Sequence, residues 1–317
     1  MKRSIPLPVA LIFVGSTCAF AQDERRVPAL YGRVNLTPLI NTPAEKRTVA
    51  KVVSNASRLG LRGELPVAGS IKVIYQAEYQ FNPNKEDFDG QFITQRNSWI
   101  GLSGALGTLL AGRNDTPLRQ LQARIDQFND LQGDLRVLMV GENRPNDTIN
   151  YVSPTFGGFT FRHAAVFDGQ NTLLDRFTKA TSTSLSYTAG RFYVGVALDR
   201  DVISLEDDRN DDVRLAGQYN EGNLQLGILY ESSVNRANNR GREDGLLISA
   251  SLTRGRLVYK AQTGTSEQRY DGHRQTSLGV DYVLNPDFRW FTFFTATRAD
   301  NRNQRSDQLG VGMDIRF

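Results

Sequence analysis

The sequence predicts an all-β protein, an antiparallel transmembrane β-barrel of about sixteen strands. Nearly everywhere in the 317 residues, short segments alternate apolar and polar residues with a period of two, as half-buried strands do. Their connections alternate between tight turns and longer charged loops, a rhythm typical of membrane-spanning barrels. Beyond the first 21 residues no segment approaches 18 consecutive apolar residues, which excludes helical membrane spans.

Residues 1–21 have the layout of a secretory signal peptide. Lys2 and Arg3 precede an apolar run, and small residues lead to an expected cleavage site after Ala21. The mature domain would then be residues 22–317. The single cysteine, Cys18, lies in the part that is removed, so the mature domain has no disulfide and no cysteine metal site.

The expected strands of the first half set one apolar face against one polar face. They are residues 30–36, 57–64, 71–81, 92–103, 108–113, 147–152 and 159–167. Residues 71–81, IKVIYQAEYQF, give the longest clean alternation. Four arginines lie on the polar faces, namely Arg33, Arg58, Arg62 and Arg96.

The second half repeats this pattern, and each segment has one nearly charge-free face. The segments are residues 181–188, 192–198, 213–219, 224–230, 246–252, 257–261, 277–284, 288–296 and 308–317. With the first half they make about sixteen strands, an even number as expected of single-chain bacterial barrels. Residues 308–317, QLGVGMDIRF, are expected to close the barrel and end in Phe317.

A soluble β-sandwich is the alternative, because antiparallel sandwiches also alternate apolar and polar residues. Two features weigh against it. The chain has many more strand segments than one sandwich needs, and several apolar faces end in aromatic residues such as Tyr79, Tyr219 and Tyr230. Aromatic residues at the ends of outward faces suit the interface girdles of a membrane barrel.

One stretch, residues 112–146, breaks the period of two. Leu118, Leu121 and Ile125 fall at roughly helical spacing among charged residues, and a polar run follows. A loop of this length in an all-β chain is usually functional or disordered. Two interpretations stay open: a mobile surface excursion, or a loop at about residues 114–146 that folds into the barrel lumen.

The arginines on the polar faces are the candidate site. An Arg at the midplane of a barrel's lipid face costs roughly 2 to 4 kcal/mol, so Arg33, Arg58, Arg62 and Arg96 must face the lumen. There, fixed positive charge opposite carboxylates selects ions electrostatically. The alternative is that these arginines are ordinary wall charges paired with Glu64 and Glu78.

Other classes of function find little support. The 38 Lys and Arg against 34 Asp and Glu give a net charge of only +4, which argues against a nucleic-acid binder. The two histidines, His163 and His273, have no nucleophile partner and no metal-ligand spacing. We therefore expect no catalytic residue, no cofactor and no metal, and a protein that is not an enzyme.

Four segments, in order, carry a family resemblance. The sequences LYG from Leu30, SRLGLRGE from Ser57, GLSGALGTLLAGR from Gly101 and NYVSPTFGGFTF from Asn150 resemble the Gram-negative general porins, especially their betaproteobacterial branch. The resemblance covers most of the mature chain. It implies a homotrimer of sixteen-stranded barrels in the outer membrane, each with its third loop folded inward to narrow the pore.

The resemblance also assigns residues to the constriction. Arg58 and Arg96 match the family's basic cluster on the wall, and Arg33 and Arg62 are its neighbours. Arg113, at the start of the loop, completes the expected basic set. Asp126 and Asp130 are the expected acidic residues opposite, although the loop lacks the Pro-Glu-Phe-Gly-Gly turn of enterobacterial relatives. Further loop carboxylates therefore stay open as alternatives, namely Asp115, Asp134 and Glu142.

The expected function is a water-filled channel for small hydrophilic solutes and ions with a mild anion preference. A solute-specific channel for small carboxylates or phosphate is the alternative within transport, favoured by Arg119, Arg124, Arg136 and Arg144 in the loop. A non-conducting structural or adhesive barrel is the other. Expected partners are outer-membrane lipid, lipopolysaccharide, and the barrel assembly machinery through Phe317.

Overall fold

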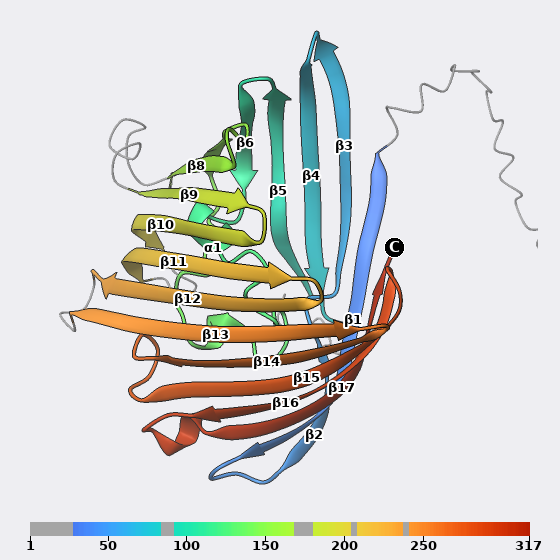
Figure 1. Cartoon of the computed structure of the whole chain (residues 1–317), viewed down its shortest axis with the longest axis vertical. Coiled ribbons are helices and arrows are strands. Elements are labelled where there is room, and N and C mark those ends of the chain that lie inside the picture. The colour runs from blue at the N-terminus through green and yellow to red at the C-terminus, as the bar shows by residue number, and fades with distance from the viewer. Residues whose placement is uncertain (1–27, 84–91, 168–179, 204–207, 237–240) are drawn as a thin grey trace, which may run out of the picture.

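The computed structural model describes residues 28–83, 92–167, 180–203, 208–236 and 241–317, and the expected signal peptide lies outside them. The described residues form one antiparallel sheet that closes on itself (Figure 1). The predicted barrel is therefore confirmed, and the alternative of a two-sheet sandwich is excluded. None of the helices in the described ranges has the length and apolar character to cross a membrane.

Seventeen strand segments make up the sheet in the described residues. The first eight are β1 (Ala29–Pro43), β2 (Val49–Ser54), β3 (Arg58–Ala68), β4 (Ile71–Phe81), β5 (Ile93–Gly104), β6 (Gly107–Arg113), β7 (Thr148–Val152) and β8 (Phe159–Val166). The others are β9 (Thr181–Ala189), β10 (Phe192–Ile203), β11 (Arg209–Glu221), β12 (Leu224–Asn235), β13 (Arg242–Arg254), β14 (Leu257–Ser266), β15 (His273–Asn285), β16 (Phe288–Arg298) and β17 (Ser306–Arg316).

The strands β2 and β3 count as one strand of the barrel. Both pair with β1, with Ser54 opposite Leu36 and Arg58 opposite Arg33. The backbone N–H of Asn55, between them, donates to the carbonyl of Asn35 at 2.8 Å. An extra residue in the interrupted strand shifts the register, as in a β-bulge. The barrel therefore has sixteen strands, as the sequence predicts.

The connections differ at the two ends of the barrel. Six links at one end have two residues each, and four of them contain a glycine with φ between 52° and 59°, a conformation that suits glycine in tight turns. The start of β1 and Phe317 lie together at this end, because Gly32 and Phe317 exchange backbone hydrogen bonds at 2.8 and 3.1 Å. Short turns mark the periplasmic end of such barrels, so the long loops are extracellular.

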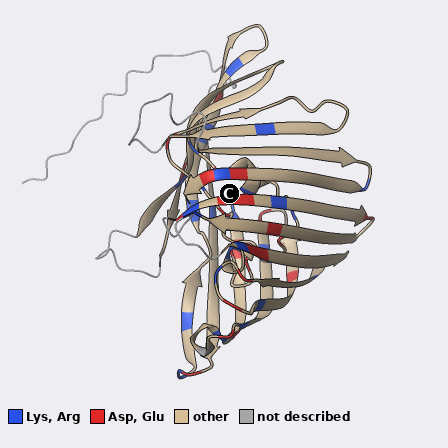
Figure 2. Ribbon diagram, turned by 90° about the vertical axis from the view of Figure 1, so that its left-hand side faces the viewer, with Lys and Arg blue, Asp and Glu red and all other residues tan. Residues whose placement is uncertain are grey.

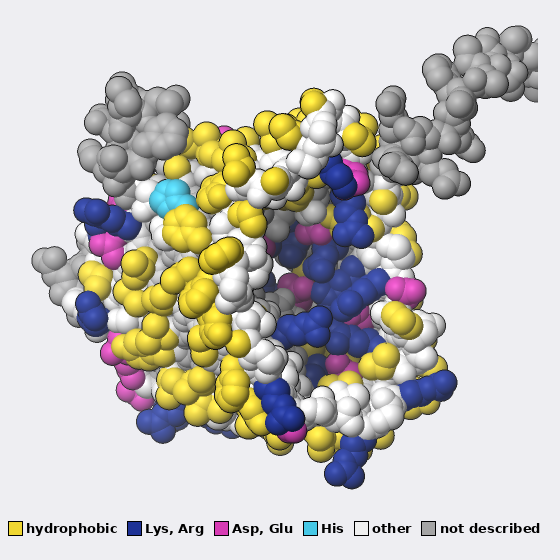
Figure 3. Space-filling model, turned by 45° about the horizontal axis from the view of Figure 1, so that its top comes forward, with side chains coloured by type: hydrophobic (Ala, Val, Ile, Leu, Met, Phe, Trp, Pro, Cys, Tyr) yellow, Lys and Arg dark blue, Asp and Glu magenta, His cyan; other side chains and the backbone are white. Residues whose placement is uncertain are grey.

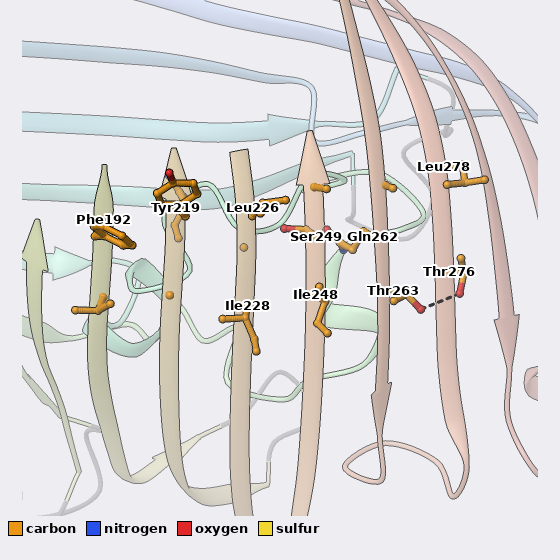
Figure 4. A pocket seen from close by; sticks show the side chains of 16 residues that line it. Phe192, Tyr219, Leu226, Ile228, Ile248, Ser249, Gln262, Thr263, Thr276 and Leu278 are labelled. Atoms are coloured by element: carbon orange, nitrogen blue, oxygen red, sulfur yellow. Dashed lines mark hydrogen bonds between the residues drawn. The ribbon is translucent and has the colours of Figure 1, made fainter. Parts of the chain in front are cut away.

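The two faces of the strands have opposite character. In β12, for example, Leu226 and Ile228 are 43% and 49% exposed, while Leu229 and Glu231, on the inner side, are fully buried. The outer face of β10 to β15 carries an apolar groove of about 610 Å³ (Figure 4). The hydroxyls of Thr263 and Thr276, which line it, pair with each other at 2.9 Å. This groove faces lipid and does not belong to the pore.

Candidate functional site: the pore constriction

Residues 114–147 connect β6 to β7 and are called loop 3 here. They include the short helix α1 (Pro117–Gln120), where the Thr116 hydroxyl accepts the N–H of Arg119 at 3.2 Å, and the 3-10 turn η1 (Leu135–Val137). The apolar loop side chains Leu118, Leu121, Ile125, Leu135, Leu138 and Met139 pack with inward residues of β10 to β13. Loop 3 therefore folds into the lumen, and the interpretation as a surface excursion is excluded.

Glycines in the wall make room for loop 3. A Cβ atom added at Gly227 would lie 2.9 Å from Cγ2 of Ile125, and one at Gly264 would lie 2.6 Å from Cδ1 of Leu138. Real side chains do not approach so closely in a core packed to normal density. Small residues at these wall positions therefore let the loop lie flat against the barrel.

Asp126 holds the loop in shape rather than facing the pore arginines. One carboxylate oxygen accepts the N–H of Phe128 at 2.9 Å and the side-chain amide of Gln262 at 3.0 Å, and the other accepts the N–H of Leu135 at 3.0 Å. Burial, followed by the charge of Asp134, raises its pKa to about 8. The structure thus differs from the expectation for Asp126, because alternation and spacing do not show which backbone groups lack a partner.

Arg33 and Asp130 form the centre of the constriction. Nη1 of Arg33 donates to Oδ2 of Asp130 at 2.6 Å, and its Nε donates to Oδ1 of Asp314 at 2.7 Å. Nη1 of Arg58 lies 3.3 Å from the same Oδ2 of Asp130. Asp130 therefore contacts the wall arginines directly, whereas the sequence predicted only that it would lie across the opening from them.

On the side of β4 and β5, one carboxylate is shared by two arginines. Oε1 of Glu78 is 2.7 Å from Nε of Arg96, and Oε2 is 3.5 Å from Nε of Arg58. Arg96 also donates to the side-chain oxygen of Gln80 at 3.0 Å. The other suggested partner, Glu64, pairs instead with Lys72 at 2.9 Å in an exposed position.

On the side of β14 to β17 the same pattern continues. Arg289 lies 2.9 Å from Asp314 and 2.8 Å from Asp281, and Nζ of Lys260 is 2.8 Å from Asp281. Loop 3 covers this end, because Nζ of Lys260 lies 5.0 Å from the centre of the Phe128 ring.

These ion pairs join into one continuous row, which we call the charge belt. In order around the wall it consists of Lys260, Asp281, Arg289, Asp314, Arg33, Asp130, Arg58, Glu78 and Arg96. Each carboxylate is shared by two neighbouring cations of the row, and both ends are basic. Asp314 also lies 3.4 Å from Arg316, whose side chain is more than half exposed. Basic and acidic positions accordingly lie side by side on neighbouring strands near the C-terminus in Figure 2.

Two of the expected basic residues lie next to the belt rather than in it. The guanidinium carbon of Arg62 is 4.9 Å from the centre of the Tyr31 ring, and the Tyr31 hydroxyl donates to Glu78 at 3.1 Å. Arg113, at the root of loop 3, donates to the side-chain oxygen of Asn146 at 2.6 Å. The structure thus brings together Arg33, Arg58 and Arg96.

Four of the nine belt residues were not predicted from the sequence. Lys260, Asp281, Arg289 and Asp314 come from the last four strands and were not singled out. The available signal was the single charged residue on an otherwise uncharged strand face, as Lys260 is in residues 257–261. Only barrel closure, through the pairing of β17 with β1, places these residues beside Arg33.

A second ionic cluster attaches the loop to the opposite wall. Asp115 lies 2.7 Å from Arg144 and 3.4 Å from Arg119, and Arg119 lies 3.3 Å from Glu142. Glu142 in turn pairs with the fully buried Arg214 of β11 at 2.8 Å. Arg119 and Arg144 are therefore neutralised within the loop, while Arg124 and Arg136 are exposed.

The loop carboxylates in ion pairs are strongly acidic. Burial acts to raise the pKa of Asp130, but the guanidinium groups of Arg33, Arg96 and Arg58 outweigh it and hold the pKa below its ordinary value of 3.8. Burial likewise opposes the charges of Arg119 and Arg144 at Asp115, whose pKa is also lowered. Both side chains are therefore ionised at neutral pH.

The space-filling view shows the result as a hollow lined by many Lys and Arg side chains with fewer acidic ones (Figure 3). Within the belt, the side chains of Arg58 and Arg289 are 24% and 27% exposed, while no carboxylate exceeds 10%. A solute therefore meets guanidinium groups in front of carboxylates. In the described ranges, no three His, Cys, Asp or Glu residues group in a way that could hold a metal ion.

Comparisons with known proteins agree with this architecture. A family model for Gram-negative porins matches residues 9–304. Outer membrane porin protein 32 of Delftia acidovorans is 28% identical over 277 residues, which cover 81% of this chain and 78% of that protein.

Two solved structures share the fold. The anion-selective porin from Comamonas acidovorans has a TM-score of 0.71 at 18% identity and covers 92% of this chain and 99% of its own. The trimer form of OmpT from Vibrio cholerae has a TM-score of 0.63 at 13% identity, with coverage of 92% and 99%. The sixteen-stranded barrel, its inward loop and the family match together show that the chain belongs to the Gram-negative porin family and forms a channel in the outer membrane.

Proposed function

We propose that this channel passes small hydrophilic solutes and ions with a mild preference for anions, and that the charge belt sets this preference. The observation that carries the proposal is the order of exposure in the belt, where arginines cover the carboxylates they bind. The belt has five cations and four carboxylates, so its formal charge is +1. The anion-selective porin of Comamonas acidovorans, which shares the fold, supports the same direction.

Physics favours a mild preference over a strong one. A lumen narrowed by a loop holds less water and screens fixed charge less than an open surface does. Each belt carboxylate, however, cancels much of the field of the two cations beside it. What remains is the excess of one charge and the forward position of Arg58 and Arg289, which raise the local anion concentration most at low salt.

The test removes cations and carboxylates of the belt in turn. In the double variant Arg58→Gln and Arg96→Gln, Glu78 loses both of its cationic partners, so the reversal potential in a salt gradient should move toward cation preference. The single variant Glu78→Gln removes the carboxylate that Arg58 and Arg96 share and should move the reversal potential the opposite way. Single-channel recording in planar bilayers measures both.

Lys72→Gln is the matched control, because Lys72 belongs to an exposed ion pair with Glu64 outside the belt. Screening in open water leaves such pairs with little influence, so its reversal potential should stay at the wild-type value. An unchanged potential in both belt variants, with intact barrels, would leave these arginines as ordinary wall charges.

A solute-specific channel for small anions is the second candidate function. It is favoured by the exposed loop arginine Arg136, which stands outside the belt and outside the cluster around Asp115. We keep it as a refinement of the same anion preference.

The remaining proposals concern export and assembly. Removal of residues 1–21, a homotrimer, contacts with outer-membrane lipid and lipopolysaccharide, and recognition of Phe317 by the barrel assembly machinery are consistent with a porin. The trimer form of OmpT from Vibrio cholerae, which shares the fold, supports the trimer. The family is one of channels, and we propose that the protein has no catalytic activity.

A further inference from the structure

A polar cavity opens at the extracellular mouth, between the long loops and the tip of loop 3. It measures about 720 Å³. Its lining includes residues 43–47 and 303–306, the loop 3 residues Leu131, Gln132, Arg136 and Val137, and Arg269, Tyr270 and His273. Small-molecule sites typically enclose about 300 to 1,000 Å³. We call this cavity the vestibule pocket.

The vestibule pocket is strongly basic. Five cationic side chains line it against one carboxylate, and they are Lys46, Arg47, Arg136, Arg269 and Arg305, with Glu45. They come from four separate segments of the chain, so the cations surround the cavity instead of forming one run. Neutral amides at Gln132, Gln304 and Gln308 add hydrogen-bonding groups to the lining.

Its charges are held differently from those of the charge belt. Lys46 and Arg47 have no carboxylate within ion-pair distance among the residues that the structure describes. Arg305 donates to the carbonyl of Ala299 at 2.6 Å, which leaves its charge in place. Arg136 lies 3.7 Å from Asp134, with half of its side chain exposed. Within the described ranges, positive charge without a paired carboxylate, that of Lys46, Arg47 and Arg305, therefore lines the vestibule pocket.

The spacing of these cations selects for ligand charge. An exposed ion pair contributes little binding free energy, so one carboxylate meeting one arginine at the mouth is barely retained. An anion with several charges can contact cations from two or three loops at once, and those contributions act together. A monovalent anion gains nothing comparable.

We propose that the vestibule pocket binds small anions carrying two or more negative charges, such as tricarboxylates and phosphates, before they enter the constriction. This rests on the proposed anion channel and names its substrate class. Such anions would be concentrated at the mouth and would also occupy the path of smaller ions while bound. Multivalent anions should therefore block chloride current from the extracellular side.

The experiment uses purified trimers in planar bilayers with potassium chloride on both sides. Citrate added on the loop side should reduce the chloride current, while acetate at equal total negative charge should not. Inorganic phosphate is a second probe, and its ratio to citrate separates a phosphate site from a carboxylate site. Citrate added on the side of the short turns should block more weakly, because it must first pass the charge belt.

The triple variant Lys46→Gln, Arg47→Gln and Arg136→Gln should raise the half-blocking citrate concentration by about tenfold or more, as expected for the loss of several weak contacts. Arg124→Gln is the matched control. Arg124 is exposed too, but its carbonyl accepts the side-chain amide of Gln225 at 2.7 Å, near the short turn that starts β12. Its removal at the other mouth should leave block by citrate unchanged.

The vestibule proposal and the anion channel fail in different ways. Equal block of the wild type and the triple variant, or equal block by acetate, would overturn the vestibule pocket and leave the channel intact. Absence of any conductance would overturn the channel. In that case equilibrium dialysis of labelled citrate against the same trimers still tests the pocket, since the triple variant must bind less than the wild type.

Discussion

Asp130 shows how a single loop residue completes the wall of the pore. Its carboxylate joins Arg33 of β1 to Arg58 of β3, which stand opposite each other in the sheet. Without Asp130 the belt would break into two halves with a surplus of positive charge between them. Loop 3 therefore contributes an ionic link as well as narrowing the lumen.

The lowered pKa of Asp130 predicts how selectivity depends on pH. Because the pKa of Asp130 is below 3.8 in the folded state, its ionised carboxylate stabilises loop 3 at pH values above 3.8. This stabilisation is lost as the pH falls through the lowered pKa. The reversal potential should therefore stay nearly constant from pH 7 down to about 4. Below that, protonation of Asp130 leaves Arg33 and Arg58 less compensated, and anion preference should rise.

Recording the reversal potential of Asp130→Asn across the same pH range checks this assignment. The variant should already show the higher anion preference at pH 7, with a smaller change on acidification. Glu64→Gln, which removes an exposed carboxylate, should keep the wild-type profile. If Asp130→Asn kept the full change in reversal potential on acidification, another titrating group would be responsible for that change.

Part of this site was predictable from single residues. Alternation with period two sends Arg33, Arg58 and Arg96 inward, and the cost of charge in lipid decides between the two faces. Asp126 and Asp130 could not be told apart, because both lie in a polar stretch without a period. Their roles depend on the path of the loop in three dimensions. This path brings the backbone N–H groups of Phe128 and Leu135 to Asp126, and it brings Arg33 and Arg58 to Asp130.

At the scale of elements, loop 3 and the inner wall fit each other through side-chain size. Helical spacing of Leu118, Leu121 and Ile125 predicted one apolar side of the loop, and the structure confirms that side as buried. The wall it meets was not predictable. Glycine at Gly227 reads as a weak strand residue in the sequence, and only the packed loop explains it.

A larger residue at this contact should shift the loop. Gly227→Val puts methyl groups where Ile125 lies, and overpacking of this kind costs about 1 to 3 kcal/mol. Because the wall is continuous, the loop moves toward the lumen, so single-channel conductance should fall and become noisier. Adding Ile125→Ala to the variant should restore part of the wild-type conductance, because Ser249, whose Oγ would lie 2.7 Å from the new Cβ atom, stays in place.

Gly217→Val tests the specificity of that result. Gly217 lies on the neighbouring strand β11, and an added Cβ atom would be 3.2 Å from Cγ2 of Ile228 on the outer face. This substitution meets a lipid-facing side chain instead of loop 3, so conductance should not change. If both valine variants lowered conductance alike, a general weakening of the barrel would be the cause.

At the scale of the whole molecule, closure of the barrel determines which charges meet. The number of strands and the closing role of residues 308–317 followed from the sequence, and the pairing of β17 with β1 confirms them. That pairing puts Asp314 next to Arg33, at opposite ends of the chain. Pairwise contacts across such a closure have no local signal in one sequence, which is why the belt was only partly predicted.

The seam between the termini leads to the last prediction, which concerns Phe317. Its backbone exchanges two hydrogen bonds with Gly32, and its ring lies where a Gly32 side chain would be, while the residue itself is 62% exposed. A largely exposed ring contributes little to the folded barrel, so a requirement for it would come from recognition during assembly. Deleting Phe317 should strongly reduce the amount of the proposed trimer in outer-membrane fractions, and Phe317→Tyr should preserve it. Purified chains without Phe317 should still refold in detergent to a β-rich barrel by circular dichroism, because the remaining pairs between β1 and β17 are intact. Failure to refold would make Phe317 a structural residue of the seam, and an undiminished trimer yield in cells would remove it from assembly altogether.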